Sequence, residues 1–235
     1  MRLLVLAGGF GARLKTVVTD YPKALAPIGN VPFLQLQIEH WLTQGIREFT
    51  FLLHYQAYQI IAFLQSEMCT QFKDCKVDWV IEPMPMDTGG ALAHAIKTLA
   101  LKGDVLITNA DTWLGSGIYE LMQTPTPAMA VVSISDVSRY GQVYFDNSHR
   151  VSAFGEKNGQ CIDGWINAGL YRFSTKLFSN WDNQPFSLER KILATLVQNG
   201  RLTAVPLQTD FIDIGVPVDY YRFCRWVATG RHGPL

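Results

Sequence analysis

The sequence predicts an α/β fold, with a mostly parallel central sheet flanked by helices and an additional, partly antiparallel sheet. Short apolar runs alternate with segments of helical periodicity through the first half of the chain. β-rich segments separated by turn residues follow in the second half. The chain has 235 residues, of which 48% are hydrophobic, which suits one large core. We therefore expect residues 1–235 to form a single domain.

The first half alternates strands with helices. Residues 3–7 form an apolar run that ends in glycines, which is typical of a buried strand leading into a phosphate-binding turn. Apolar residues spaced three and four apart predict a helix over 33–42, which Gly45 ends. The same reasoning predicts strands at 49–53, 77–81 and 105–108 and helices at 58–64 and 90–99.

The second half changes character. Its short β-rich segments are separated by turn residues, so we expect additional sheet that carries the substrate side of a cleft. The expected strands are 128–133, 142–145, 151–154, 169–173 and 202–205, with helices at 188–198 and 217–227.

Charge and hydropathy limit the partners. Twenty basic and twenty acidic residues cancel, so nothing indicates nucleic acid or an anionic membrane as a partner. The N-terminal apolar run is too short for a signal-peptide core, and no later stretch reaches transmembrane length. We expect a cytoplasmic protein, either a monomer or a small homo-oligomer.

The clearest chemical signal lies after the first strand. Gly8, Gly9 and Gly11 are followed by Arg13 and, ten residues later, by Lys23. Glycines at a strand end let backbone N–H groups approach an anion, and the two cations can neutralise a polyphosphate. The spacing matches neither the Walker nor the dinucleotide fingerprint. A tight turn would explain the glycines alone, but together with the two cations they predict a phosphate cradle.

Two aspartates are candidates for a metal site. Asp111 follows the strand expected at 105–108, and parallel sheets bind their ligands at the carboxyl ends of strands. Asp213 has apolar neighbours, so a buried carboxylate there needs a cation or hydrogen-bond donors. Both suit a hard cation. Position alone favours a helix cap or turn for Asp111, and it is the family resemblance given below that favours the metal.

Taken in order, these segments resemble the sugar-nucleotidyltransferase family over nearly the whole chain. The family signature G-G-x-G-x-R-L followed by P-K-x-L-x-P-I is matched at 8–14 and 22–28, and its late D-I-G-T-P segment at 213–217. The resemblance implies a Rossmann-like nucleotidyltransferase fold. It also implies an enzyme that joins a nucleoside triphosphate to a sugar 1-phosphate and releases pyrophosphate.

The resemblance implies a role for each matched residue. Arg13 would bind the leaving phosphates, Lys23 and Lys157 would lie near the reacting phosphates, and Asp111 and Asp213 would hold Mg²⁺. The other matched residues would bind the two substrates, although taken singly they could be ordinary turn or helix-entry residues. Those that would bind the nucleotide are Ala7, Gly8, Gly9, Gly11, Glu82, Thr88, Gly89 and Asn109, and those that would bind the sugar are Gly141, Glu156 and Asn167. The chain departs from the family pattern at Ala12, Asp87, Ala110 and Asn158.

Within the family, the chain most resembles members that use GTP and D-glycero-α-D-manno-heptose 1-phosphate. The F-S-x-E segment at 186–189 and the ending at 211–221 carry this likeness. UTP with N-acetylmuramate 1-phosphate, or GTP with mannose 1-phosphate, are the alternatives. A protein of a different class, a nucleotide-sugar sensor without turnover, is disfavoured because it would not need the complete set of charged residues.

Overall fold

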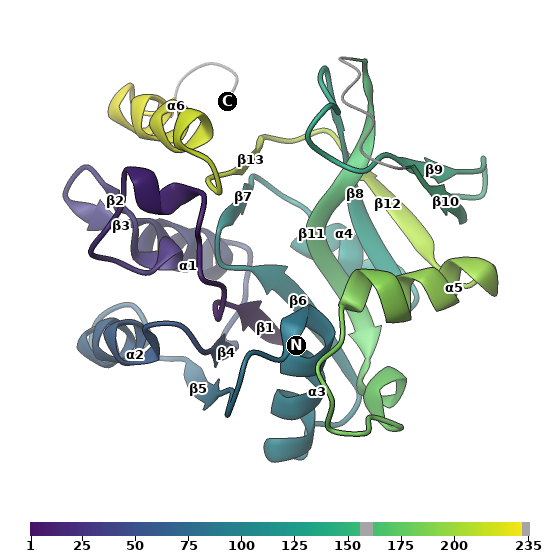
Figure 1. Ribbon diagram of the computed structural model, residues 1–235, viewed down its shortest axis with the longest axis horizontal. Coiled ribbons are helices and arrows are strands. Elements are labelled where there is room, and N and C mark those ends of the chain that lie inside the picture. Colours follow the sequence, from purple (N-terminus) through teal and green to yellow (C-terminus); the bar gives the residue numbers. More distant parts are fainter. Residues whose placement is uncertain (156–161, 232–235) are drawn as a thin grey trace. The chain divides into compact units, whose positions relative to one another are not determined.

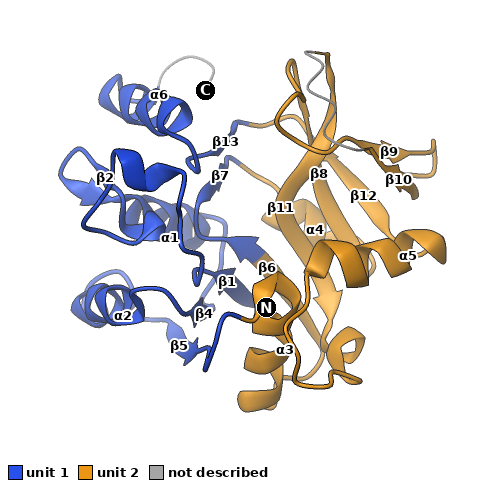
Figure 2. Cartoon of the chain, in the orientation of Figure 1, with its two compact units in different colours: residues 1–85, 108–115, 210–235 blue, residues 86–107, 116–209 orange. Residues whose placement is uncertain are grey.

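The computed structural model describes residues 1–155 and 162–231, and the chain divides into two compact units (Figure 2). Unit 1 comprises Met1–Pro85, Thr108–Gly115 and Asp210–Leu235, and unit 2 comprises Met86–Ile107 and Ser116–Thr209. The chain enters each unit more than once, so neither unit is one continuous segment.

Unit 1 is built on three parallel strands, with β4 hydrogen-bonded to both β1 and β5 (Figure 1). The β1 residues Leu3, Leu4 and Val5 are completely buried, as expected for a strand inside a parallel sheet. The elements of this unit are β1 (Arg2–Leu6), β2 (Pro27–Ile28), β3 (Val31–Pro32), α1 (Phe33–Thr43), β4 (Glu48–Leu53), α2 (Ala57–Ser66), β5 (Lys76–Ile81), β7 (Thr112–Leu114), β13 (Phe211–Asp213) and α6 (Pro217–Ala228), with 3₁₀ turns at Leu14–Thr16 and Lys23–Leu25.

A short antiparallel ladder in unit 1 brings two distant segments together. β7 pairs with β13, and Thr112 lies opposite Asp213. Ile212 and Ile214 are both buried in a cluster that includes Trp113. Because successive side chains in extended chain point to opposite sides, Asp213 points away from that cluster. The apolar neighbours therefore fix the direction of the Asp213 carboxylate.

Unit 2 is organised around β8, which pairs in parallel with β12 and antiparallel with β11. β9 and β10 form a separate antiparallel pair, and β6 carries the chain from unit 2 into unit 1. The elements are α3 (Asp87–Thr98), β6 (Asp104–Asn109), α4 (Ile118–Gln123), β8 (Ala128–Ile134), β9 (Val143–Phe145), β10 (Val151–Phe154), β11 (Gly164–Ser174), a 3₁₀ turn (Thr175–Phe178), a π-helix (Leu188–Leu193), α5 (Ala194–Gln198) and β12 (Thr203–Leu207).

The α/β architecture expected from the sequence is confirmed. In the main sheet the pairs β1–β4, β4–β5 and β8–β12 are parallel and β8–β11 is antiparallel, and every expected helix is present. Two elements differ from expectation. The helix expected at 188–198 begins as a π-helix, and the strand expected at 169–173 extends over Gly164–Ser174. No helix in the described ranges combines the length and apolar character that crossing a bilayer requires.

Candidate active site

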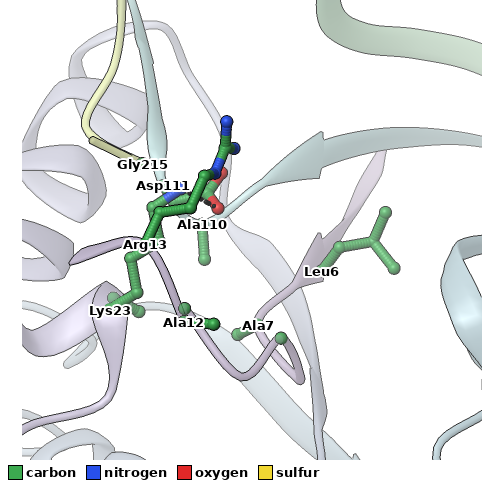
Figure 3. Close-up of a pocket in the computed structure, with 11 residues that line it drawn as sticks. Leu6, Ala7, Ala12, Arg13, Lys23, Ala110, Asp111 and Gly215 are labelled. Carbon is green, nitrogen blue, oxygen red and sulfur yellow. Dashed lines mark hydrogen bonds and ion pairs between the residues drawn. The ribbon is translucent and has the colours of Figure 1, made fainter. Parts of the chain in front are cut away.

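A pocket of about 250 Å³ in unit 1 lies at the end of β1 (Figure 3). Arg13, Lys23 and Asp111 contribute its charged lining, and the rest is small or apolar. The lining comprises Leu6, Ala7, Gly9, Gly11, Ala12, Arg13, Lys23, Ala24, Ala110, Asp111 and Gly215. Six residues that the sequence singled out, Ala7, Gly9, Gly11, Arg13, Lys23 and Asp111, therefore share one pocket.

Gly11 shapes the loop that follows β1. Its φ of +62° favours glycine, and an added Cβ would lie 3.1 Å from Cβ of Lys23. Its carbonyl accepts the N–H of Leu14 at 3.0 Å, which begins a 3₁₀ turn. Leu14 is buried and anchors that turn, whereas Arg13 is exposed. The Arg13 guanidinium is thus carried on a fixed backbone at the edge of the pocket.

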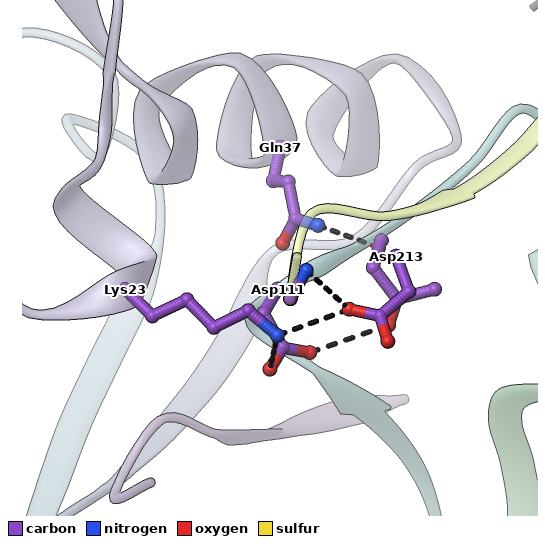
Figure 4. A network of polar contacts seen from close by, with 6 residues as sticks. Lys23, Gln37, Asp111 and Asp213 are labelled. Atoms are coloured by element: carbon purple, nitrogen blue, oxygen red, sulfur yellow. Dashed lines mark hydrogen bonds and ion pairs between the residues drawn. The ribbon is translucent and has the colours of Figure 1, made fainter. Parts of the chain in front are cut away.

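Lys23 joins the two aspartates that the sequence proposed as metal ligands (Figure 4). Its Nζ donates to Oδ2 of Asp111 at 2.6 Å and to Oδ1 of Asp213 at 3.0 Å. The Lys23 side chain is only 12% exposed, against 34% for Asp111 and 28% for Asp213. Two carboxylates that lie far apart in sequence therefore share one ammonium group.

The environment of Lys23 favours its charged form. Burial alone would lower its pKa, but the charges of Asp111 and Asp213, together with hydrogen bonds to both, outweigh that effect and raise the pKa above 10.5. Lys23 is therefore an ammonium at neutral pH.

Backbone and amide contacts hold the two aspartates in place. The N–H of Gly215 donates to Oδ1 of Asp213 at 2.7 Å, and the N–H of Ile214 donates to the carbonyl of Asp111 at 3.0 Å. From α1, the buried Gln37 donates through Nε2 to the carbonyl of Thr112 at 2.6 Å. Neither Gly215 nor Gln37 was predicted from the sequence. A polar residue on the apolar face of the helix was the signal for Gln37.

Three other proposed nucleotide residues of unit 1 lie outside the lining of this pocket. Gly8 faces the buried Glu82, because a Cβ on Gly8 would lie 2.6 Å from Oε1 of Glu82. Asn109 ends β6, and the N–H of the next residue, Ala110, donates to the carbonyl of Leu6 at 3.0 Å. Gly8, Glu82 and Asn109 therefore support the loop that follows β1 or lie next to it.

Thr88 and Gly89 belong to unit 2, in the first turn of α3. The Thr88 hydroxyl donates to Oε2 of Glu189 at 2.8 Å and accepts the N–H of Leu188 at 2.9 Å. A Cβ on Gly89 would overlap the ring of Phe186, and the N–H of Gly89 donates to the Phe186 carbonyl at 2.9 Å. Asp87, one of the departures from the family pattern, has a left-handed φ of 57°, the conformation that glycine adopts most readily.

A second pocket, of about 300 Å³, lies within unit 2. Gly141 and Asn167, both proposed for the sugar, line it together with Tyr140, Phe154, Glu189 and Leu193. Asn167 is fixed in place, since its Oδ1 accepts the N–H of Gly169 at 2.9 Å and its Nδ2 donates to the Tyr171 hydroxyl at 2.7 Å. Glu156, predicted to bind the sugar, and Lys157, predicted to lie near the reacting phosphates, are outside the described residues.

The fold and the charged loop at the end of β1 define a nucleotide-handling enzyme, and the chain belongs to the nucleotidyl transferase family, whose model matches residues 2–229. It is 33% identical to the D-glycero-alpha-D-manno-heptose 1-phosphate guanylyltransferase of Campylobacter jejuni over 95% of this chain and 98% of that protein. Its structure resembles HddC from Yersinia pseudotuberculosis complexed with GMP-PN, with a TM-score of 0.82, 31% identity and coverage of 96% and 99% of the two chains.

A more distant relative shares the guanylyl chemistry in its name. The catalytic subunit beta of a mannose-1-phosphate guanylyltransferase from Drosophila melanogaster is 28% identical over 98% of this chain, but over only 64% of that protein. The family model and the similarity to the Yersinia structure confirm the Rossmann-like nucleotidyltransferase fold expected from the sequence.

Enzymes of this family typically use a divalent metal ion. In the described ranges, no group of three or more His, Cys, Asp or Glu side chains could hold a metal by itself. Mg²⁺, however, is commonly bound by one or two carboxylates together with substrate phosphates. The convergence of Asp111 and Asp213 on the Lys23 ammonium shows that these carboxylates can share a cation, so the residues present fit Mg²⁺.

Proposed function

We propose that this enzyme transfers a nucleoside monophosphate from GTP to D-glycero-α-D-manno-heptose 1-phosphate, releasing pyrophosphate and forming a nucleotide-activated sugar. The observation that carries the proposal is the pocket of unit 1, where Arg13, Lys23 and Asp111 meet and Lys23 also binds Asp213. The name of the Campylobacter protein supports both the guanine nucleotide and the heptose, and the GMP-PN complex of the Yersinia protein supports the guanine nucleotide.

The residues around the loop after β1 would bind the triphosphate. Backbone N–H groups of Gly8, Gly9 and Gly11 suit phosphate oxygens at the end of a strand. Ala7, whose own N–H donates to the Leu52 carbonyl at 2.9 Å, lines the pocket of unit 1. Arg13 would bind the leaving phosphates through its guanidinium. Glu82, Thr88, Gly89 and Asn109 complete the proposed nucleotide set.

In the reaction, an oxygen of the sugar phosphate attacks the α-phosphorus in line. A new bond forms between that oxygen and the α-phosphorus, while the bond from the α-phosphorus to the bridging oxygen of pyrophosphate breaks. No covalent enzyme intermediate is needed, so this chain's residues act by positioning the substrates and neutralising their charge. Lys23 would exchange its carboxylate partners for phosphate oxygens, and Lys157 would reduce the repulsion between the two anionic substrates.

Asp111 and Asp213 would hold Mg²⁺, which supplies neutralisation of the triphosphate charge. On the sugar side, we propose Gly141, Glu156 and Asn167 as the binding residues. The family model matches residues 2–229, a range that includes residues of both units, and this supports the proposal that residues 1–235 act as one functional domain.

The test is pyrophosphate release measured over a matrix of nucleoside triphosphates and sugar 1-phosphates in the presence of Mg²⁺. We expect the highest kcat/KM with GTP and the heptose 1-phosphate. A tenfold preference for UTP would overturn the guanylyl assignment, and a preference for mannose 1-phosphate would overturn the heptose assignment. Nucleotide-sugar binding without any pyrophosphate release would instead indicate a sensor.

A further inference from the structure

Glu189 occupies an unusual position in unit 2. It lies in the π-helix Leu188–Leu193, directly before α5. π-helical turns are rare and occur frequently at functional sites, because their i to i+5 hydrogen bonds widen the turn and redirect side chains. Glu189 and Leu193, which lie four residues apart in this helix, both line the 300 Å³ pocket.

Among residues 1–155 and 162–231, the hydrogen bonds to the Glu189 carboxylate reach one of its two oxygens. Its Oε2 accepts hydrogen bonds from the hydroxyls of Thr88 at 2.8 Å and Ser187 at 2.7 Å. Ser187 also caps the π-helix by accepting the N–H of Arg190 at 3.2 Å, and Thr88 accepts the N–H of Leu188. Because a carboxylate accepts hydrogen bonds on both oxygens, Oε1 can accept donors from a ligand.

A second polar side chain of the pocket, that of Asn167, is fixed as well. Asn167 is held by Gly169 and by the buried Tyr171. Burial raises the pKa of Tyr171, and the negative charge of Glu189 raises it further, so Tyr171 remains a neutral phenol beside the pocket. The amide nitrogen of Asn167 has two N–H groups, of which Tyr171 accepts one.

The pocket as a whole suits a small polyhydroxylated ligand. Tyr140 and Phe154 supply apolar surface, while Glu189 and Asn167 supply an acceptor and a donor. A carboxylate repels a phosphate but accepts hydrogen bonds from hydroxyls, so Glu189 selects for the hydroxyl-bearing part of a sugar phosphate.

We propose that Glu189 is a specificity-determining residue, which accepts hydrogen bonds from hydroxyl groups of the sugar through Oε1 while Thr88 and Ser187 hold Oε2. This inference rests on the proposed function, because it needs a sugar 1-phosphate as substrate. It assigns the Thr88 hydroxyl to holding Glu189 on the sugar side, in place of the nucleotide contact that the family resemblance implies.

The experiment compares Glu189→Gln and Thr88→Val with wild type, using pyrophosphate release with GTP and the heptose 1-phosphate. Glu120→Gln is the matched control, because Glu120 is an exposed glutamate of α4 in the same unit and outside the pocket. We expect Glu189→Gln to raise the KM for the sugar phosphate tenfold or more and to leave the KM for GTP within twofold of wild type. Thr88→Val should raise the same KM by a smaller factor, since it removes one of the two hydroxyls that hold Oε2 and leaves the carboxylate in place.

A KM for the sugar phosphate in Glu189→Gln equal to that of Glu120→Gln would overturn the inference, as would a rise in the KM for GTP alone. If thermal melting shows that Glu189→Gln does not fold, Thr88→Val takes its place. The inference then requires that Thr88→Val raise the KM for the sugar phosphate and leave the KM for GTP within twofold of wild type. Both results leave the proposed function intact when wild type turns over the sugar phosphate. Absence of turnover in wild type with every sugar 1-phosphate would overturn the proposed function, and this inference with it.

Discussion

Replacing Lys23 by methionine tests the charge arrangement at the centre of the pocket. The substitution keeps an unbranched apolar stem and removes the ammonium that Asp111 and Asp213 share at 2.6 and 3.0 Å. A hydrogen bond to a charged group contributes about 1.5–3 kcal/mol. Solvent screens both aspartates in part, and the variant avoids the cost of burying Lys23, so we expect a net loss of about 1–3 kcal/mol. At this chain length that lowers Tm by roughly 2–12 °C.

Magnesium should distinguish this effect from a general loss of packing. In Lys23→Met the two carboxylates face each other without a cation, so Mg²⁺ can bind between them and restore part of the lost stability. In wild type without nucleotide, the Lys23 ammonium already neutralises them. Thermal melts in EDTA and in Mg²⁺ should therefore show a larger Mg²⁺-dependent rise in Tm for the variant.

The control is Lys73→Met, which removes an exposed lysine of the same unit. Equal Tm values for Lys23→Met and Lys73→Met in EDTA would refute the reasoning, and so would equal responses to Mg²⁺.

The pH dependence gives a second check. Because the pKa of Lys23 is raised above 10.5 in the folded protein, its stabilisation is complete below 10.5 and is lost only as pH rises through the higher folded value. The Tm difference should thus persist at neutral pH and shrink in strongly alkaline buffer.

Three further predictions use steady-state pyrophosphate release together with thermal melts. Arg13→Ala should lower kcat with little change in Tm, because the exposed guanidinium acts on the leaving phosphates; unaltered kcat would show that Arg13 has no such contact. Asp111→Asn and Asp213→Asn should each lower kcat by about two orders of magnitude, or about 2.7 kcal/mol of barrier. Near-normal kcat at ordinary Mg²⁺ would exclude that aspartate from the metal site. Gly215→Ala places a Cβ 2.6 Å from Nζ of Lys23 and 2.7 Å from Oδ1 of Asp213, so it should displace both flexible groups and lower kcat more than Tm. Wild-type kcat in Gly215→Ala would contradict the idea that their positions matter.

The sequence by itself determined the local elements and the identity of the charged residues. Apolar periodicity is a local property, so it revealed the helix at 33–42 and the strand at 49–53, close to the observed α1 and β4. The family resemblance identified Lys23, Asp111 and Asp213, because each of them lies within a short, continuous sequence motif. Their roles follow from the resemblance and stay a proposal.

The three-residue strands β7 and β13 were not predicted, nor was the six-residue helix α4. Such segments are too short for periodicity to show, and β7 exists only because it pairs with β13 from the far end of the chain. The π-helix at Leu188–Leu193 was likewise read as a regular helix, since the widened turn leaves no composition signal.

Only the tertiary structure decided which groups meet. Lys23 contacts Asp111 and Asp213 because the β7–β13 ladder sets Thr112 opposite Asp213, and the buried isoleucines turn that carboxylate away from the core. The tertiary structure also brings the Thr88 hydroxyl within hydrogen-bond distance of the Glu189 carboxylate. A sequence specifies what each residue can donate, accept or neutralise, whereas partners distant in the chain are selected by the packing of the apolar residues between them.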